Sequence, residues 1–172
     1  MKISLIDIET TGLNPFKNEI LEIGVVVFDS ESMHISKKLN IKVKPTHPED
    51  GDPNAYKVNG YTKEGWKGAI SLKKAMEFFG EECKGSTLMA YNGFFDWSFL
   101  EKAFIDTGIK SPFPYHKLDL LSIAYGRIPH SKVASWSLKT VATFLGVPRE
   151  ATIHRALQGA ECEYEVYKKL MG

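Results

Sequence analysis

The pattern of apolar and polar positions predicts three β-strands in the first quarter of the chain. Apolar residues run through residues 2–9 and 20–28 and recur along residues 34–43. A polar stretch at residues 29–32 separates the last two segments and suits a hairpin turn. We therefore expect three sequential antiparallel strands. The first is apolar on both faces, which is typical of the middle of a sheet.

The remainder of the chain alternates between helical and strand patterns. Helical spacing marks residues 71–79, 95–104, 137–145 and about 153–170, and short apolar strands are expected at residues 87–91 and 116–120. Residues 45–68 are rich in proline and glycine and are expected to cover a site or to carry short helical turns. This order predicts an α/β fold in which helices flank a mixed five-stranded sheet, a layout that resembles the ribonuclease H-like fold.

Two acidic residues, Asp7 and Glu9, stand at the end of the first strand, directly before the turn at residues 10–12. Because side chains alternate along a strand, both carboxylates face the same side. Two such acids repel each other unless a cation lies between them, and together they suit a hard metal ion. The alternative is a solvated strand end, but the apolar flanks place these acids on a central strand, where unpartnered charges are costly.

Composition indicates an ordinary globular protein with no strong electrostatic bias. The 172 residues are 43% hydrophobic and 25% charged, which fits one domain over residues 1–172. The formal net charge of +1 gives no global basic field, so a nucleic-acid partner would be held by local contacts and metal. Two cysteines, no leader and no membrane-length apolar run favour a cytoplasmic setting without membrane contact.

A second acidic signal follows the strand expected at residues 87–91. Asn92 and Asp96 lie between that strand and the next helix, where ligand sites gather in such sheets, so Asp96 could face Asp7 and Glu9. Alternatively, Asp96 is an acid favoured by the helix dipole and Asn92 is a turn residue.

Aromatic side chains are dense around Asp96. The i, i+4 spacing of Phe95 and Phe99 favours a place in the core, whereas Phe94 or Trp97 could stack on a nucleic-acid base. An aromatic cluster alone does not establish nucleic-acid binding.

His154 is the third signal. It is expected in the first turn of the last helix, where the helix dipole favours a neutral, proton-accepting imidazole that suits a general base. The alternative is an ordinary surface or core histidine. The presence of Asp7, Glu9 and Asp96 in the same chain favours the general-base interpretation of His154.

Three segments in this order resemble the motifs of the histidine branch of the DEDD exonuclease superfamily (DEDDh), which includes the proofreading epsilon subunit of polymerase III and ribonuclease T. The segments are Asp7-Ile8-Glu9-Thr10-Thr11-Gly12-Leu13, Asn92 to Asp96, and His154-Arg155-Ala156-Leu157 with Ala160. The resemblance runs from about residue 2 to 170 and includes Glu19-Ile20-Leu21-Glu22-Ile23-Gly24-Val25 and Ser137-Leu138.

The resemblance implies removal of nucleotides from the 3′ end of single-stranded or frayed DNA or RNA by two Mg²⁺ or Mn²⁺ ions. Asp7 would bridge the ions, Glu9 would bind the nucleophile-side ion and Asp96 would support the second. His154 would deprotonate the water. A DNA polymerase or another nucleic-acid enzyme is an implied partner. The substrate contacts implied are Thr10, Thr11, Gly12, Leu13, Asn92 and Phe95.

One position departs from the family pattern. The fourth family carboxylate falls five residues after the histidine, where this chain has Gly159, either as its natural residue or as an introduced substitution. Its loss should weaken metal binding and slow catalysis. Glu163 lies one helical turn further and could reach back through a water, and Glu161 shares the face of His154. The simpler interpretation of both glutamates is a solvated surface.

Three functions remain open at this point. The first is a DEDDh-type 3′–5′ exonuclease, active or impaired. The second is a weakly active or inactive nucleic-acid-binding or polymerase-associated module, which would bind metal without turnover. The third, a phosphatase or other hydrolase on the same scaffold, is disfavoured because the His154 motif belongs to the exonuclease pattern.

Overall fold

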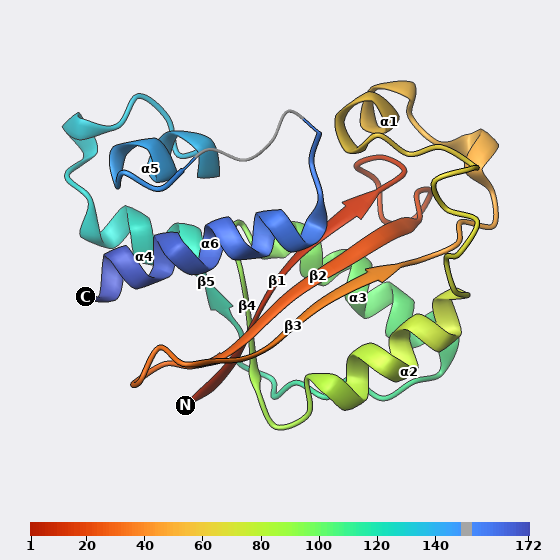
Figure 1. The fold of residues 1–172 in the computed structure, drawn as a ribbon, viewed down its shortest axis with the longest axis horizontal. Helices are drawn as coiled ribbons and strands as arrows, with labels where there is room; N and C mark the ends of the chain where they lie inside the picture. Colours follow the sequence, from red (N-terminus) through yellow and green to blue (C-terminus); the bar gives the residue numbers. More distant parts are fainter. Residues whose placement is uncertain (149–152) are drawn as a thin grey trace.

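The first strand lies in the centre of a mixed five-stranded sheet, as its two apolar faces predict (Figure 1). The structure is a computed structural model that describes residues 1–148 and 153–172. The strand order is β3-β2-β1-β4-β5; β1 to β3 are antiparallel, and β4 and β5 run parallel to β1. The strands are β1 (Lys2–Thr10), β2 (Ile20–Asp29), β3 (Ile35–Lys42), β4 (Thr87–Ala90) and β5 (Leu118–Asp119). The predicted α/β, ribonuclease H-like layout is confirmed.

Helices follow most of the predicted helical segments. They are α1 (Pro53–Asn59), α2 (Leu72–Glu82), α3 (Phe94–Thr107), α4 (Leu120–Arg127), α5 (Leu138–Phe144) and α6 (Ala156–Met171), with 3-10 turns η1 (Pro48–Asp50) and η2 (His130–Lys132). The proline-rich segment carries η1 and α1, which confirms the expected short helical turns. Helix α4 was not predicted, because its apolar residues continue directly from the short strand β5.

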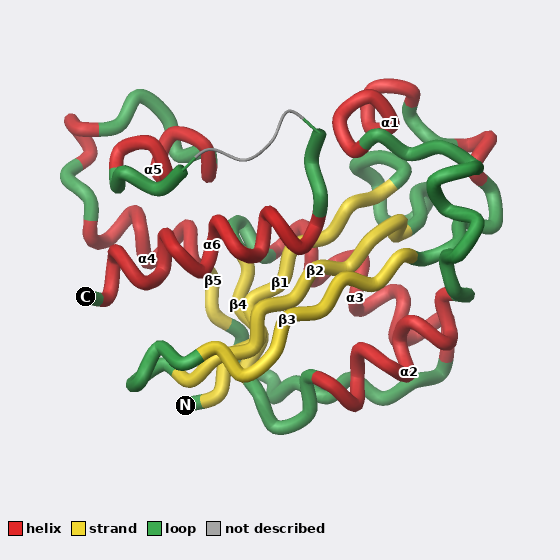
Figure 2. Tube along the Cα trace, viewed as in Figure 1, coloured by secondary structure: helices red, strands yellow, loops and turns green. Residues whose placement is uncertain are grey.

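Two cores cover the two faces of the sheet, and β1 contributes to both. Ile6 and Ile8 pack in the core beneath α2 and α3, whereas Ile3 and Leu5 pack beneath α4, α5 and α6. The helices accordingly flank the strands on both sides (Figure 2). None of the helices described is both long enough and apolar enough to cross a membrane.

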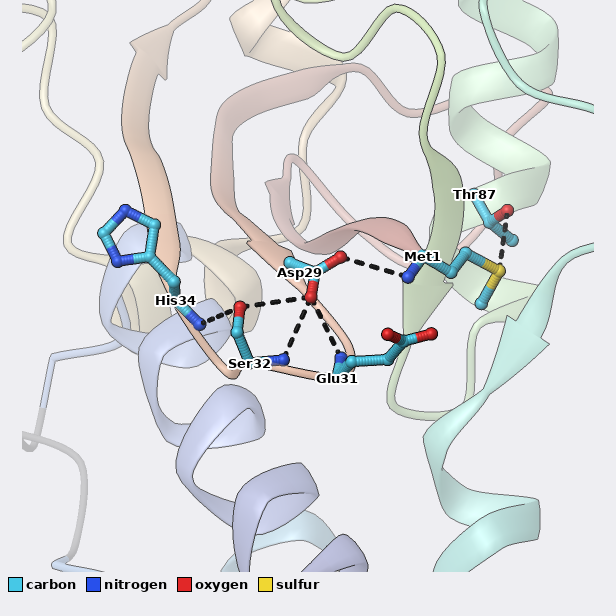
Figure 3. Close-up of polar contacts among 6 residues, drawn as sticks. All are labelled: Met1, Asp29, Glu31, Ser32, His34 and Thr87. Atoms are coloured by element: carbon cyan, nitrogen blue, oxygen red, sulfur yellow. Dashed lines mark hydrogen bonds and ion pairs between the residues drawn. The ribbon is translucent and has the colours of Figure 1, made fainter.

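Asp29 holds the predicted hairpin turn between β2 and β3 (Figure 3). Its Oδ1 accepts hydrogen bonds from the backbone N–H groups of Glu31 (3.1 Å) and Ser32 (3.0 Å), and its Oδ2 lies 3.0 Å from the amino group of Met1. These contacts, with the Ser32 N–H first and the Met1 amino group next, hold the pKa of Asp29 well below its usual range.

Helix α6 crosses the sheet in close contact with β2 and β1. Gly24 of β2 makes this possible, because a Cβ there would lie 2.1 Å from the carbonyl oxygen of Ala156. Gly24 is the register partner of Asp7 on β1. The first turn of α6 is therefore fixed at the level of the acidic end of β1.

Candidate active site

Asp7 and Glu9 lie near the end of β1 on the face that α6 covers. They alternate with Ile6 and Ile8 and share the parity of Leu5, which belongs to the core beneath α6. Both acids are partly buried. The expected arrangement of two carboxylates on one face is thus present.

Gly159 of α6 lies directly against Asp7. A Cβ at position 159 would fall 2.0 Å from Asp7 Oδ2 and 2.7 Å from its Cγ, far inside van der Waals contact. The carboxylate of Asp7 therefore occupies the space that a side chain at position 159 would fill. A carboxylate at position 159, where the resembled family carries its fourth acid, could not fit unless Asp7 moved.

Asp96 meets β1 between the two motif acids. It lies in the first turn of α3, is only 3% exposed, and accepts a hydrogen bond through Oδ1 from the backbone N–H of Ile8 (3.1 Å). Strand β4 pairs with β1 only as far as Leu5. Beyond Leu5, on the same side of β1, the side chain of Asp96 accepts the backbone hydrogen bond of Ile8. Burial raises the pKa of Asp96 to about 7, although hydrogen bonds from its own N–H and that of Ile8 oppose the shift.

Asn92 shapes the turn that leads to Asp96. Its φ of 58° lies in the left-handed region, which asparagine tolerates better than most residues. The next residue, Gly93, donates its N–H to Asp119 Oδ1 at 3.1 Å, and Asp119 Oδ2 accepts the N–H of Ser122 to cap α4. Asp119 was not selected from the sequence. Its position directly before a helix, where aspartate is a favoured N-cap, could have identified it.

His154 lies outside the last helix, so its predicted place in the first helical turn is wrong. Helix α6 begins at Ala156, and Arg155 holds the N-cap position. The His154 backbone N–H instead donates to the carbonyl of Val58 in α1 at 3.0 Å. The side chain of His154 is exposed. The helix-dipole argument for a neutral imidazole required His154 to lie inside the helix and therefore does not apply. The position of His154 beside α1 was not predicted from the sequence.

The turn after β1 is held by its two threonines. Thr10 Oγ1 donates to the carbonyl of Gly12 at 2.7 Å, and Thr11 Oγ1 accepts the N–H of Glu19 at 2.9 Å. Both threonines are buried, whereas Leu13 is 80% exposed. Of the predicted substrate contacts in this turn, Leu13 therefore presents the most side-chain surface to a ligand.

The aromatic residues of α3 divide between core and surface. Phe95 packs against the core with its ring 5.1 Å from that of Phe99, whereas Phe94 is 85% exposed. The spacing argument that placed Phe95 and Phe99 in the core is confirmed. Phe94 is the side chain that remains open to stacking.

Glu161 and Glu163 of α6 differ in environment. Glu161 pairs with Lys38 at 2.8 Å on the surface, as the solvated interpretation expects. That interpretation is wrong for Glu163, which is 2% exposed and accepts the backbone N–H of Tyr91 at 3.0 Å. Tyr91 lies two residues beyond Met89, the register partner of Leu5, and so stands level with Asp7. Glu163 is thus fixed near the acidic end of β1.

Helix α1 connects the turn after β1 to the segment that carries His154. The side chain of Asn59 donates to the carbonyl of Thr10 at 2.9 Å, and its backbone carbonyl accepts a hydrogen bond from Arg155 Nη1 at 2.9 Å. Asn59 is 1% exposed, and sequence patterns alone gave no reason to select it.

The donor set suits a hard divalent cation, but the side chains are not gathered into a ready cage. Asp7, Glu9 and Asp96 supply carboxylate oxygens, the ligands that Mg²⁺ and Mn²⁺ prefer. Within residues 1–148 and 153–172, however, no three His, Cys, Asp or Glu side chains are placed so that they could hold a metal as they stand. The carboxylate of Asp7 lies against Gly159, in the space that a side chain at position 159 would fill.

Comparison with known proteins identifies relatives over most of the chain. Residues 4–167 match a family model described as exonuclease (RNase_T). The chain is 31% identical to a PolC-type DNA polymerase III of Mycoplasmopsis pulmonis over 87% of its length, but it spans only 10% of that polymerase. It is 30% identical to ribonuclease T of a Shewanella species over 95% of its length and 78% of that enzyme.

A solved structure shares the fold. The zinc-bound complex of Escherichia coli exonuclease I with single-stranded DNA superposes with a TM-score of 0.79 at 17% identity, covering 95% of this chain and 39% of that one. At this identity the likeness establishes the fold alone.

Proposed function

The chain belongs to the exonuclease family whose model it matches over residues 4–167, and we propose that it removes nucleotides from the 3′ ends of single-stranded or frayed nucleic acid. The observation that carries the proposal is the meeting of its three motif segments. Asp96 bonds to Ile8 between Asp7 and Glu9, and α6 brings Gly159 against Asp7. Segments far apart in sequence thus converge at the end of β1.

Three carboxylates hold the metal in this proposal. Asp7, Glu9 and Asp96 would bind two Mg²⁺ or Mn²⁺ ions, which when bound supply Lewis-acid catalysis and an activated water for phosphodiester hydrolysis. Of these three carboxylates, Asp7 would be the one shared by both ions. The hydrogen bond from Ile8 orients the buried carboxylate of Asp96.

The protein's other residues bind the strand end and move the proton. The exposed imidazole of His154 accepts the proton of the attacking water. Thr10, Thr11 and Gly12 form the rigid turn that receives the terminal nucleotide, and Leu13 packs on its base. Asn92 sets the adjacent turn, and the exposed ring of Phe94 stacks on a further base, a role that suits it better than the core-packed Phe95.

The names of the relatives refer to both DNA and RNA. The proposal therefore specifies a single-stranded or frayed substrate and does not choose between DNA and RNA. One relative is a ribonuclease, one is part of a DNA polymerase, and the structural neighbour is bound to single-stranded DNA. A net charge of +1 also favours single strands over nonspecific duplex binding. The relationship to a PolC-type DNA polymerase III supports association with a DNA polymerase as a partner proposal. The proposed cytoplasmic setting rests on the sequence features alone.

A second candidate function is a weakly active or inactive nucleic-acid-binding module. Gly159 favours it, because the family carboxylate is missing and the carboxylate of Asp7 lies where a side chain at position 159 would be. Such a protein would bind metal and single strands with little turnover.

The test measures release of nucleotides from defined ends. With Mg²⁺ or Mn²⁺, the protein should release labelled mononucleotides from 3′-labelled single strands of DNA or RNA and leave circular single strands intact. Asp7→Asn should nearly abolish release and metal binding, because one carboxylate serves both ions. Asp106→Asn is the matched control, since Asp106 lies on the exposed side of α3 in an ion pair with Lys102. Equal release by the wild type and Asp7→Asn would refute the proposal; metal binding without release would support the second candidate.

A further inference from the structure

Glu22 is a buried carboxylate outside the set of proposed metal ligands. It lies on β2 with 0% exposure, and neither carboxylate oxygen has a hydrogen-bond partner among the described residues. Its register partner is Glu9, so the two side chains face the same side of the sheet. A buried charge without hydrogen bonds is costly and needs a compensating positive charge nearby.

Two positive features of the segment that enters α6 lie next to Glu22. Arg155 Nη1 is 3.9 Å from Glu22 Oε2. The first turn of α6 rests on Gly24, two residues from Glu22 on the same face, and the α6 N-terminus has no side-chain cap. The N-terminal end of a helix carries partial positive charge. Glu22 therefore places its negative charge at the point where the chain passes from His154 into the helix.

Arg155 is also held by groups other than Glu22. Its Nη1 donates to the carbonyl of Asn59, and its guanidinium lies 5.3 Å from the ring centre of Trp66. The preceding residue, His154, donates its backbone N–H to the carbonyl of Val58, which lies in α1 next to Asn59. The path of the chain at His154 is thus determined by two hydrogen bonds to α1 and by the ion pair between partly exposed Arg155 and buried Glu22.

We propose that Glu22 is a positioning residue for His154, acting through Arg155. The buried charge fixes the guanidinium, the guanidinium fixes the backbone next to His154, and the imidazole is thereby directed toward the acids of β1. This inference rests on the proposed function, in which His154 accepts the proton of the attacking water. The competing interpretation is that Glu22 binds metal itself, because it is the register partner of Glu9.

The experiment compares Glu22→Gln in two backgrounds. Misplacing a catalytic group by about 1 Å costs on the order of 100-fold in rate, so Glu22→Gln should lower kcat by roughly 10- to 100-fold with little change in KM. In a His154→Ala background the same substitution should have almost no further effect, because the group it positions is gone. Arg155→Ala should reproduce the loss, and its combination with Glu22→Gln should not be additive. Glu161→Gln, which breaks an exposed pair on α6, is the matched control and should leave kcat unchanged.

Two measurements do not depend on activity. Mn²⁺ affinity by calorimetry should be unchanged in Glu22→Gln; a large loss would instead identify Glu22 as a ligand and overturn the positioning role. The NMR signal of the His154 ring, assigned by its absence in His154→Ala, should shift or broaden in Glu22→Gln. An unmoved signal, or an equal loss of rate in both backgrounds, would also overturn it. A wild type without nuclease activity would refute the proposed function, while the NMR comparison still decides whether Glu22 positions His154.

Discussion

At the scale of single residues, Gly159 and Asp7 share one small volume. Substitution at position 159 must move Asp7, because a Cβ would lie 2.0 Å from Asp7 Oδ2. The far end of a carboxylate side chain can rotate, so this clash redirects Asp7 rather than excluding the substitution. A carboxylate introduced at position 159 would therefore change both the number of proposed metal ligands and the direction of Asp7.

Gly159→Asp is expected to increase both divalent-metal affinity and cleavage, by about tenfold or more, since even indirect metal-ligand contacts are worth 10- to 100-fold. The gain should be larger in Mg²⁺ than in Mn²⁺, because Mg²⁺ demands near-ideal octahedral oxygen coordination. Calorimetry and single-turnover cleavage measure the two effects.

Gly159→Ala is the matched control, since it displaces Asp7 without adding a carboxylate. An equal gain from alanine would assign the effect to Asp7 alone. No gain from Gly159→Asp, with loss of activity in Glu163→Gln, would mean that Glu163 already supplies the missing oxygen.

At the scale of elements, the β2–β3 hairpin depends on one carboxylate at its turn. Asp29 binds two backbone N–H groups and the amino group of Met1, so its pKa is lower in the folded protein than in the unfolded chain. For an acid with a lowered folded pKa, the stabilisation is present above its unfolded pKa of about 4 and is lost as the pH falls through the folded value.

Asp29→Asn should therefore reduce the stability of the protein at neutral pH, and the difference from wild type should shrink progressively below about pH 4. Urea unfolding at a series of pH values measures this difference. A constant difference across the whole pH range would show that packing or turn geometry, rather than charge, accounts for the effect.

Local sequence patterns predicted the elements whose signals are local. The apolar alternation of β1 gave both its central position and the common face of Asp7 and Glu9, because strand periodicity needs no tertiary information. The start of α6 was placed too early because an apolar pattern does not report where the backbone first becomes helical. Asn59 was not selected from the sequence, and Glu22 and Arg155 were noted only as parts of family segments, because their contacts join distant segments and no periodicity encodes such contacts.

At the scale of the whole molecule, the low net charge limits how the protein can hold nucleic acid. A formal charge of +1 provides little general attraction to phosphate, so the proposed binding relies on local contacts, among them the proposed metal ligands and the exposed side chains of Leu13 and Phe94. Bases are available to these side chains in single strands but are stacked and paired in a duplex.

The protein should consequently degrade a 3′ overhang faster than a blunt duplex end of the same sequence. Hairpin oligonucleotides with a labelled overhang, or with none, allow the two rates to be compared at one salt concentration. Comparable rates at both ends, or cuts at internal duplex positions, would contradict an end-directed site that stacks unpaired bases.

The close crossing of α6 over β1 and β2 also has a consequence for biosynthesis. A ribosome makes β1, β2 and α3 well before α6, so a nascent chain carries Asp7, Glu9 and Asp96 without His154 or the cover over one face of its central strands. Such an intermediate has uncovered apolar surface and lacks the proposed general base. The proposed hydrolytic centre can therefore form only after α6 has emerged and docked against the sheet.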